Sequence, residues 1–252
     1  MLSACIITLN EEKNLRACLE SISFADEIVV VDAGSEDQTL PIAREFTNQV
    51  FQEPWKGFAA QKNSAIRKAK GPWILSIDAD ERVSPELRME IEILLAGPAG
   101  LCAGYLIPRK NYFSGHWVRR CGWYPNYQLR LFLKDRGSFV PREVHEAVHV
   151  KGKTGKLTGH LEHLTYDSIS DYLIRMEKYA VLSAREYHKN GKKAGWIKMS
   201  TRSAYTFFRM FFLRGGFLEG YRGFLLSVLY SQYTFLKYAK LKELWDKGAD
   251  PR

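Results

Sequence analysis

The chain has 252 residues, a length that fits one α/β domain or one domain with an appendage. Lys and Arg number 37 against 28 Asp and Glu, which gives a formal net charge of +9, and 46% of the residues are hydrophobic. This composition excludes a disordered tail, a collagen-like rod and a multi-pass membrane protein. The four cysteines occur singly, which argues against a zinc ribbon or a disulfide framework and predicts a cytoplasmic protein.

The positive charge is concentrated in the last third of the chain. From Arg175 to Lys242 there are fourteen Lys or Arg and three acidic residues, an excess of +11, which leaves the rest of the chain at −2. A basic block of this kind predicts an anionic partner. A phosphate-bearing membrane surface, a phosphorylated substrate and nucleic acid all meet that description.

The first hundred residues alternate short apolar runs with helical periodicity. Strands are predicted at 4–9, 28–31, 50–51 and 73–77, and helices, with their caps, at 10–22, 37–46, 59–70 and 84–97. Asn10 is expected to cap the first helix, and Ser84, followed by Pro85, the fourth. Apolar strands separated by helices predict an α/β fold with a largely parallel sheet.

Polar residues follow three of these strands directly. They are Thr8, Asn10 and Glu11 after the first strand, Asp32, Gly34, Ser35 and Asp37 after the second, and Asp78, Asp80 and Glu81 after the fourth. Ligands of open α/β sheets bind outside the carboxyl ends of the strands. Any one of these acids could simply be a turn or cap residue, but their coincidence after three strands favours a binding site.

Asp78 and Asp80 are separated by one residue at the end of an apolar strand. Two carboxylates in such a bend can hold one hard divalent cation, Mg²⁺ or Mn²⁺, with positions left for water and phosphate oxygens. The ion would act as a Lewis acid on a departing diphosphate. A DxD pattern occurs by chance in many proteins and is weak evidence by itself. Its position directly after an apolar strand makes it a more specific indication of a metal site.

Four segments resemble, in order and spacing, the signature of family 2 glycosyltransferases with the GT-A fold. They are ITLNEEKNL at 7–15, EIVVVDAGSEDQT at 27–39, GFAAQKNSAI at 57–66 and WILSIDADE at 73–81. The resemblance implies a Rossmann-like, mostly parallel GT-A domain that binds a UDP-sugar. It also implies residue roles: uracil and ribose contacts from Thr8, Asn10, Glu11 and Asp32, a place near the donor for Lys62, and metal ligation by Asp80 with Asp78 nearby.

The chain departs from the family pattern at one position of this signature. Many members carry a second Asp where this chain has Ala33, so the nucleotide contact there rests on Asp32 alone.

The segment His145-Glu146-Ala147-Val148-His149 matches the HExxH pattern of zinc proteases. That motif binds zinc only on a helix, where the two histidines share a face. Here valines alternate with histidines between a proline and a glycine, and this period of two predicts a strand. A zinc metallopeptidase therefore stands only as an alternative.

An inverting glycosyl transfer needs a carboxylate that deprotonates the acceptor hydroxyl, and Glu146 is the candidate base. Residues 144–146, the RLF of 130–132 and the stretch from His163 to Ser168 resemble the acceptor half of bacterial lipopolysaccharide core glucosyltransferases. His163 is a candidate further ligand of the metal or the diphosphate, and Arg130 a candidate phosphate partner. The alternatives are an ion-pair role for Glu146 and a packed, hydrogen-bonded His163.

The C-terminal third predicts helices that are both basic and aromatic. They cover 170–190, a stretch from Trp196 that breaks at Gly215-Gly216, and 218–244. The uncharged run at 223–236 is shorter than the roughly 20 residues that span a bilayer, so the pattern predicts helices lying in the membrane interface. Packing on the catalytic domain and a nucleic-acid groove are the alternatives, the latter without a recognisable RNA- or DNA-binding signature.

The sequence thus predicts a GT-A catalytic domain at 1–165, with nucleotide-sugar binding at 1–100 and an acceptor part at 101–165, and a helical membrane-associating appendage at 166–252. The expected reaction is inverting transfer of a hexose, with glucose as first candidate, from a UDP-sugar to a lipopolysaccharide inner-core or other lipid-linked saccharide. It would occur at an anionic surface, the inner face of the cytoplasmic membrane, with no nucleic-acid partner. A non-catalytic membrane or nucleic-acid binding module is the remaining alternative.

Overall fold

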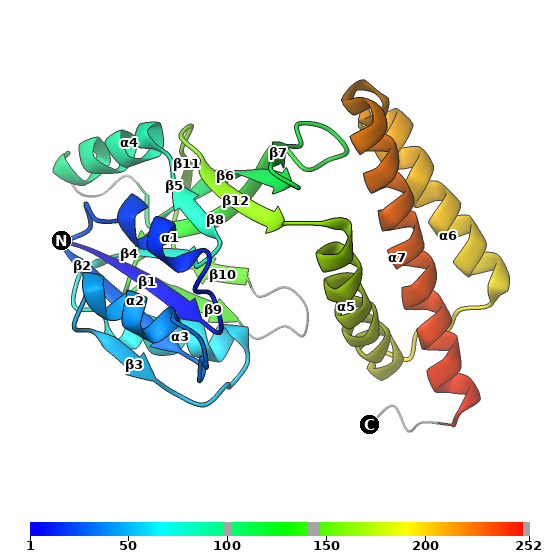
Figure 1. Ribbon diagram of the computed structural model, residues 1–252, viewed down its shortest axis with the longest axis horizontal. Helices are drawn as coiled ribbons and strands as arrows, with labels where there is room; N and C mark the ends of the chain where they lie inside the picture. Colours follow the sequence, from blue (N-terminus) through cyan, green and yellow to red (C-terminus); the bar gives the residue numbers. More distant parts are fainter. Residues whose placement is uncertain (98–101, 141–146, 249–252) are drawn as a thin grey trace. The chain divides into compact units, whose positions relative to one another are not determined.

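The computed structural model describes residues 1–97, 102–140 and 147–248 (Figure 1). The chain divides into two compact units: unit 1 comprises Met1–Lys110 and Asn126–Leu164, and unit 2 comprises Asn111–Pro125 and Thr165–Arg252. The chain thus passes between the units three times. Residues 111–125, expected to belong to the acceptor part, group with the C-terminal helices.

The first half of unit 1 is a parallel sheet with strand order β3-β2-β1-β4. Its strands are β1 (Leu2–Thr8), β2 (Glu27–Asp32), β3 (Val50–Gln52) and β4 (Trp73–Asp78). Its helices are α1 (Leu15–Ser21), α2 (Thr39–Phe46), α3 (Phe58–Lys68) and α4 (Pro85–Ala96). The predicted alternation of strands and helices is confirmed. Ser84 caps α4 as predicted, because its Oγ accepts a hydrogen bond from the N–H of Leu87 at 3.2 Å.

Both faces of this sheet are buried. Val30 of β2 belongs to one apolar cluster, whereas Val29 and Val31 belong to a second. Successive side chains of a strand point to opposite faces, so these clusters lie on the two sides of the sheet. Helices α1, α2 and α4 contribute side chains to the first cluster and α3 to the second. The result is a three-layer α/β arrangement that leaves the carboxyl ends of the strands at one edge.

Antiparallel strands continue the sheet beyond β4, a feature that the sequence pattern did not indicate. The added strands are β5 (Glu81–Val83), β6 (Gly104–Phe113), β7 (His116–Trp117), β8 (Asn126–Leu133), β11 (Thr154–Lys156) and β12 (Leu161–Tyr166). Strand β8 pairs antiparallel with both β4 and β6, whereas β11 runs parallel to β6. A separate two-stranded sheet contains β9 (Gly137–Val140) and β10 (Ala147–Val150). These strands place residues of the second half of unit 1 next to the end of β4.

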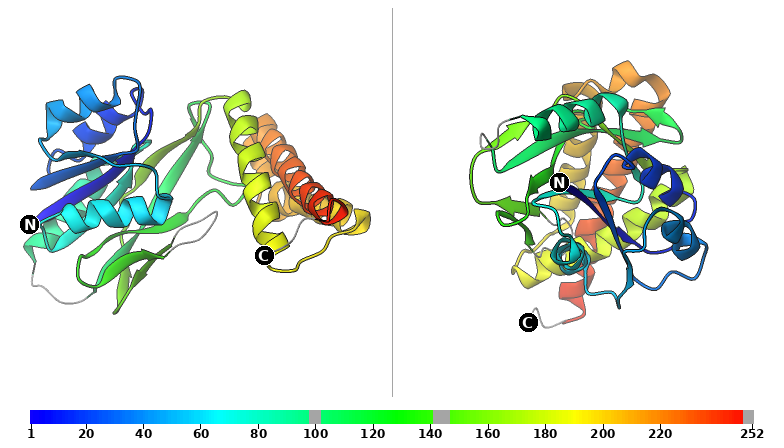
Figure 2. Two further views of the ribbon diagram at one scale, coloured as in Figure 1. Left: turned by 90° about the horizontal axis from the view of Figure 1, so that it is seen from below. Right: turned by 90° about the vertical axis from the view of Figure 1, so that its left-hand side faces the viewer.

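Unit 2 consists of the segment Asn111–Pro125, which includes the end of β6 and β7, and the C-terminal helices, which Figure 2 shows in yellow-green to red. The helices are α5 (Ile169–Lys189), α6 (Trp196–Phe208), a π-helical turn (Arg209–Leu213), a 3₁₀ turn (Gly216–Glu219) and α7 (Gly220–Asp246). The predicted break is confirmed, because Gly215 adopts a φ of 66°, in the left-handed region that favours glycine. Among the described residues, no helix combines the length and apolar character needed to cross a bilayer.

Candidate functional site

The register of β1 with its two neighbours brings the predicted polar residues to one edge of the sheet. Thr8 at the end of β1 lies opposite Asp32 of β2, and Ile7 lies opposite Asp78 of β4. Because all three strands are parallel, their carboxyl ends meet at this edge, where ligands of α/β sheets bind. The structure therefore brings together Thr8, Asp32 and Asp78, as the sequence predicted.

Asp32 is completely buried and holds the loop that follows β2. Its Oδ1 accepts a hydrogen bond from Thr8 Oγ1 at 3.0 Å and another from the Ser35 hydroxyl, while its Oδ2 accepts from the N–H groups of Gly34 at 2.9 Å and Ser35 at 2.8 Å. Both carboxylate oxygens are thus engaged by the protein. A base or ribose contact by Asp32 requires that the hydroxyl of Thr8 or Ser35 turn away.

The prediction that Asn10 caps the first helix is wrong, because α1 begins at Leu15. Asn10 has a φ of 55° and joins the loops after β1 and β2. Its N–H donates to Ser35 Oγ at 2.8 Å, and its Oδ1 accepts from the N–H of Glu36 at 2.9 Å. Nearby, the N–H of Glu11 donates to a threonine of α2 at 2.8 Å. These bonds fix the two loops against each other at the candidate nucleotide site.

Asp78 lies between two buried cations. Its Oδ1 is 2.7 Å from Lys62 Nζ, and its Oδ2 accepts a hydrogen bond from Arg130 Nη2; each cationic side chain is 5–6% exposed. Burial alone would raise the pKa of Asp78, but the charges of Arg130 and Lys62 outweigh it and hold the pKa well below its usual range. Burial likewise opposes the charge of Arg130, yet Asp78 and Glu81 raise the pKa of its guanidinium. The three charged groups form one fixed unit.

Glu81 and Arg109 complete this network; sequence reasoning placed Glu81 at the sheet edge without a specific role and missed Arg109. Glu81 is fully buried; its Oε1 lies 2.8 Å from Arg130 Nη2 and 3.0 Å from Arg109 Nη1, and its Oε2 accepts from the N–H of Asp78 at 3.1 Å. A signal was present in the sequence, since Arg109 and Arg130 interrupt largely apolar strands. A cation in a buried strand requires an anionic partner.

Asp80 and His163 form a second pair beside the network. Asp80 Oδ2 lies 3.4 Å from His163 Nε2, and the two side chains are 17% and 14% exposed. One carboxylate and one imidazole are suitable ligands for Mn²⁺ or Mg²⁺ when phosphate oxygens and water supply the others. Among the residues that the structure describes, no group of three or more His, Cys, Asp or Glu could hold a metal ion. One carboxylate and one imidazole leave coordination positions for diphosphate oxygens and water.

The HExxH segment lies only partly within the described residues. His145 and the candidate base Glu146 fall outside them, whereas residues 147–150 form strand β10, in which His149 pairs with Ser138 of β9. The strand prediction is confirmed for this half of the motif. Zinc binding by HExxH requires a helix, and His149 lies in a strand instead.

Comparisons with known proteins agree with this architecture. The sequence model of Glycosyl transferase family 2 matches residues 3–148. The lipopolysaccharide core biosynthesis glycosyltransferase LpsC of Rhizobium meliloti is 32% identical over 247 residues, which cover 95% of this chain and 91% of that protein. An uncharacterised glycosyltransferase of Rickettsia bellii is 33% identical over 254 residues, covering 96% and 86%. The chain belongs to glycosyltransferase family 2.

A solved structure supports the fold. The mannosyltransferase PcManGT of Pyrobaculum calidifontis, determined with GDP-Man and Mn²⁺, matches with a TM-score of 0.57 and 16% identity over 98% of this chain and 87% of that one. The GT-A fold predicted from the sequence is confirmed.

The lowered pKa of Asp78 generates a prediction about acid stability. Asp78→Asn leaves Lys62 and Arg130 buried without their shared anion, which we expect to cost about 3–5 kcal/mol of unfolding free energy at neutral pH. Because the folded-state pKa lies below the unfolded value of about 3.9, this stabilisation is complete above that value and is lost as the pH falls below it. Urea unfolding across the acid range should show the difference between wild type and variant shrinking below about pH 4.

The exposed Asp135, whose side chain is 77% exposed, provides the matched control. Asp135→Asn should follow the wild-type pH dependence. A difference between wild type and Asp78→Asn that stays constant into acid would contradict the assigned charge state.

Proposed function

We propose that this chain transfers a hexose, with glucose as first candidate, from a UDP-sugar to a lipopolysaccharide inner-core or other lipid-linked saccharide, with inversion at the anomeric carbon. Membership of glycosyltransferase family 2 supports glycosyl transfer as the reaction, and the similarity to LpsC supports a lipopolysaccharide acceptor. The observation that carries the donor site is the meeting of Thr8, Asp32 and Asp78 at one sheet edge.

In this proposal the nucleotide lies over the loops that follow β1 and β2. The bonds of Asn10 and Glu11 to the β2 side fix those loops, and Thr8 and Asp32 face the uracil and ribose. The neighbouring network contains three cations and two carboxylates, a net charge of +1. A net positive, preorganised group suits a diphosphate, and Lys62 and Arg130 are its candidate partners.

We assign the divalent ion, Mg²⁺ or Mn²⁺, to Asp80 and His163. Both carboxylate oxygens of Asp78 contact cations, so in this proposal Asp78 positions Lys62 and Arg130 and lies beside the ion. When bound, the ion stabilises the negative charge that develops on the leaving diphosphate. Asp80 and His163 would hold the ion at the donor end of the site.

Glu146 is the proposed general base. Its carboxylate removes the proton from the acceptor hydroxyl while that oxygen bonds to the anomeric carbon, and the bond to the diphosphate oxygen breaks on the opposite face. UDP leaves with the bonding electrons, and the configuration inverts. The residue lies outside the described part of the chain, so this role rests on the sequence.

The lipid-linked acceptor places the reaction at a membrane, and we propose that the chain is peripheral on the inner face of the cytoplasmic membrane. Exposed apolar side chains of unit 2 support this, among them Phe212, Leu213 and Leu218, which are 50%, 65% and 62% exposed. Exposed arginines such as Arg202 and Arg209 add attraction to anionic headgroups.

The most direct test of this proposal is a donor screen. UDP release should be measured with several UDP-sugars, with and without extracted core lipid. Acceptor-dependent release with one UDP-hexose supports the proposal. UDP release that no core-lipid acceptor stimulates, or the absence of nucleotide binding, would contradict the proposal.

Replacing the proposed base should separate chemistry from binding. We expect Glu146→Gln to lower the rate constant of transfer by about 10²–10⁴-fold, because the acceptor proton loses its destination, while calorimetry shows unchanged UDP affinity. Glu143→Gln removes the same charge three residues earlier and should retain activity. Near wild-type turnover by Glu146→Gln would remove this residue from the mechanism.

Replacing the proposed metal ligands should change the metal requirement. We expect Asp80→Asn to lower turnover about a hundredfold or more, because the leaving diphosphate loses its counter-charge. His163→Ala should raise the Mn²⁺ concentration needed for half-maximal rate. Asp135→Asn, at a side chain that is 77% exposed, serves as the control. If wild type turns over equally well in excess chelator, no divalent ion takes part and this assignment is wrong.

A further inference from the structure

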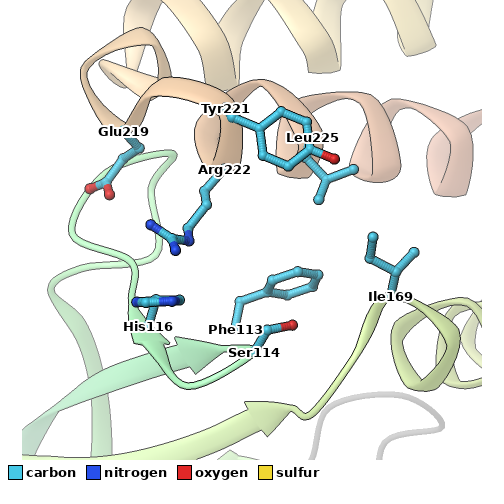
Figure 3. A pocket seen from close by; sticks show the side chains of 8 residues that line it. All are labelled: Phe113, Ser114, His116, Ile169, Glu219, Tyr221, Arg222 and Leu225. Carbon is cyan, nitrogen blue, oxygen red and sulfur yellow. The ribbon is translucent and has the colours of Figure 1, made fainter.

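Unit 2 contains a cavity between the β6–β7 hairpin and the first turn of α7 (Figure 3). Its volume is about 390 Å³. Phe113, Ile169 and Leu225 supply an apolar lining, and His116 and Arg222 supply a polar one. In Figure 3 the guanidinium of Arg222 and the ring of His116 approach each other across the opening. Such a mixed lining fits a ligand that is both apolar and anionic.

The hairpin wall of the cavity is anchored in the core of unit 2 through Phe113. Phe113 pairs with His116 across a two-residue turn in which Ser114 and Gly115 have φ values of 47° and 74°, as a type I′ turn requires. Phe113 is 3% exposed and packs edge-on against Tyr172 in the core of the unit, with ring centroids 6.3 Å apart. The hairpin therefore sets the backbone position of His116.

Arg222 lines the cavity, and three more arginines lie on segments adjoining it, since Arg119 and Arg120 follow β7 and Arg214 follows the π-helical turn. Arg119, Arg120, Arg214 and Arg222 are all exposed. The N–H of Cys121 donates to the carbonyl of Arg214 at 3.1 Å, which holds the loop that carries the first two beside the third. From Trp196 to Lys242 the chain contains eight Lys or Arg and a single acid.

That acid, Glu219, also lines the cavity, and its Oε1 accepts the N–H of Arg119 at 2.9 Å. Within the lining Glu219 offsets the charge of Arg222, and the exposed Arg119, Arg120 and Arg214 on the adjoining segments make the local charge positive. The local charge selects an anionic ligand.

Beside the mouth lies a group of exposed apolar side chains that we call the aromatic tip. It comprises Phe208, Phe212, Leu213, Phe217, Leu218, Tyr221 and Phe224, each about half exposed or more. The rings of Phe208 and Phe212 lie 5.2 Å apart, and Phe211 joins Phe212 at 5.1 Å and Phe217 at 6.4 Å. An exposed apolar group of this size marks an interaction surface.

We propose that the cavity binds the phosphate of an anionic membrane lipid while the aromatic tip enters the adjoining acyl layer. Arg222 and His116 contact the headgroup, and Phe113 and Leu225 contact the apolar part of the lipid next to it. A soluble phosphate would match the arginines and leave the exposed rings in water, whereas an anionic lipid matches both. The inference deepens the proposed function, since it names the surface and the lipid chemistry that bring the enzyme to a lipid-linked acceptor.

The test measures partition of the full chain onto vesicles without any nucleotide or acceptor. Wild type should bind vesicles of phosphatidylcholine mixed with phosphatidylglycerol and bind pure phosphatidylcholine weakly. Arg222→Gln should lower partition onto the anionic vesicles roughly fivefold. Leu213→Ser, at a residue 65% exposed, should lower it about tenfold because an apolar side chain no longer leaves water.

Matched controls separate the site from general charge and apolarity. Arg185→Gln removes the same charge from an exposed position of α5, and Ile93→Ser removes an apolar side chain, 73% exposed, from α4 of unit 1. Both should stay within about twofold of wild type. Circular dichroism and UDP affinity should be unchanged in all four variants.

Several results would overturn the inference. If Arg222→Gln and Arg185→Gln lower partition onto anionic vesicles equally, net charge alone explains the binding. Saturable binding of inorganic phosphate that Arg222→Gln removes, without vesicle binding, would assign the cavity to a soluble phosphate. Self-association that Leu213→Ser abolishes, again without vesicle binding, would assign the tip to a second copy. The vesicle experiments contain no sugar donor. A failed donor screen would therefore contradict the proposed function without contradicting this inference.

Discussion

The ion pair between Asp78 and the buried Arg130 is the constraint on which the rest of unit 1 depends. It joins the end of a parallel strand, β4, to an antiparallel one, β8, and Glu81 extends it to Arg109 on β6. Burying these cations is costly unless each has an anionic partner, so the ion pairs favour the register in which these strands meet. The same charges then stand at the sheet edge where the family's donor is expected, already desolvated and oriented.

The sequence predicted the first half of unit 1 well because local patterns determine it. Three consecutive valines in β2 and the polar residues after β1, β2 and β4 are visible without knowing any long-range contact. The alternation of valine and histidine correctly predicted a strand at His149, against the HExxH pattern. The helix cap predicted at Asn10 was wrong because an asparagine side chain can also accept a hydrogen bond from a neighbouring loop, here from the N–H of Glu36.

What the sequence could not predict depends on contacts between distant residues. Arg109 and Arg130 lie in separate strands, and nothing local shows that both reach Glu81. The complete engagement of Asp32 by Thr8 and its own loop is likewise a tertiary result. The metal assignment changes for the same reason, because only the structure shows that Asp78 already contacts two cations. Unit 2 adds a cavity lined in part by Arg222 and a group of exposed rings, which sequence alone indicated only as a basic, aromatic stretch.

Hydrogen exchange of the full chain, with and without UDP and Mn²⁺, tests the central claim most directly. If the strand-end loops form the donor site, the ligand should slow amide exchange at 9–14, 33–39 and 79–83, with the N–H groups of Gly34 and Ser35 among those most protected. Unchanged exchange in these three segments under saturating UDP, or protection confined to unit 2, would contradict the account.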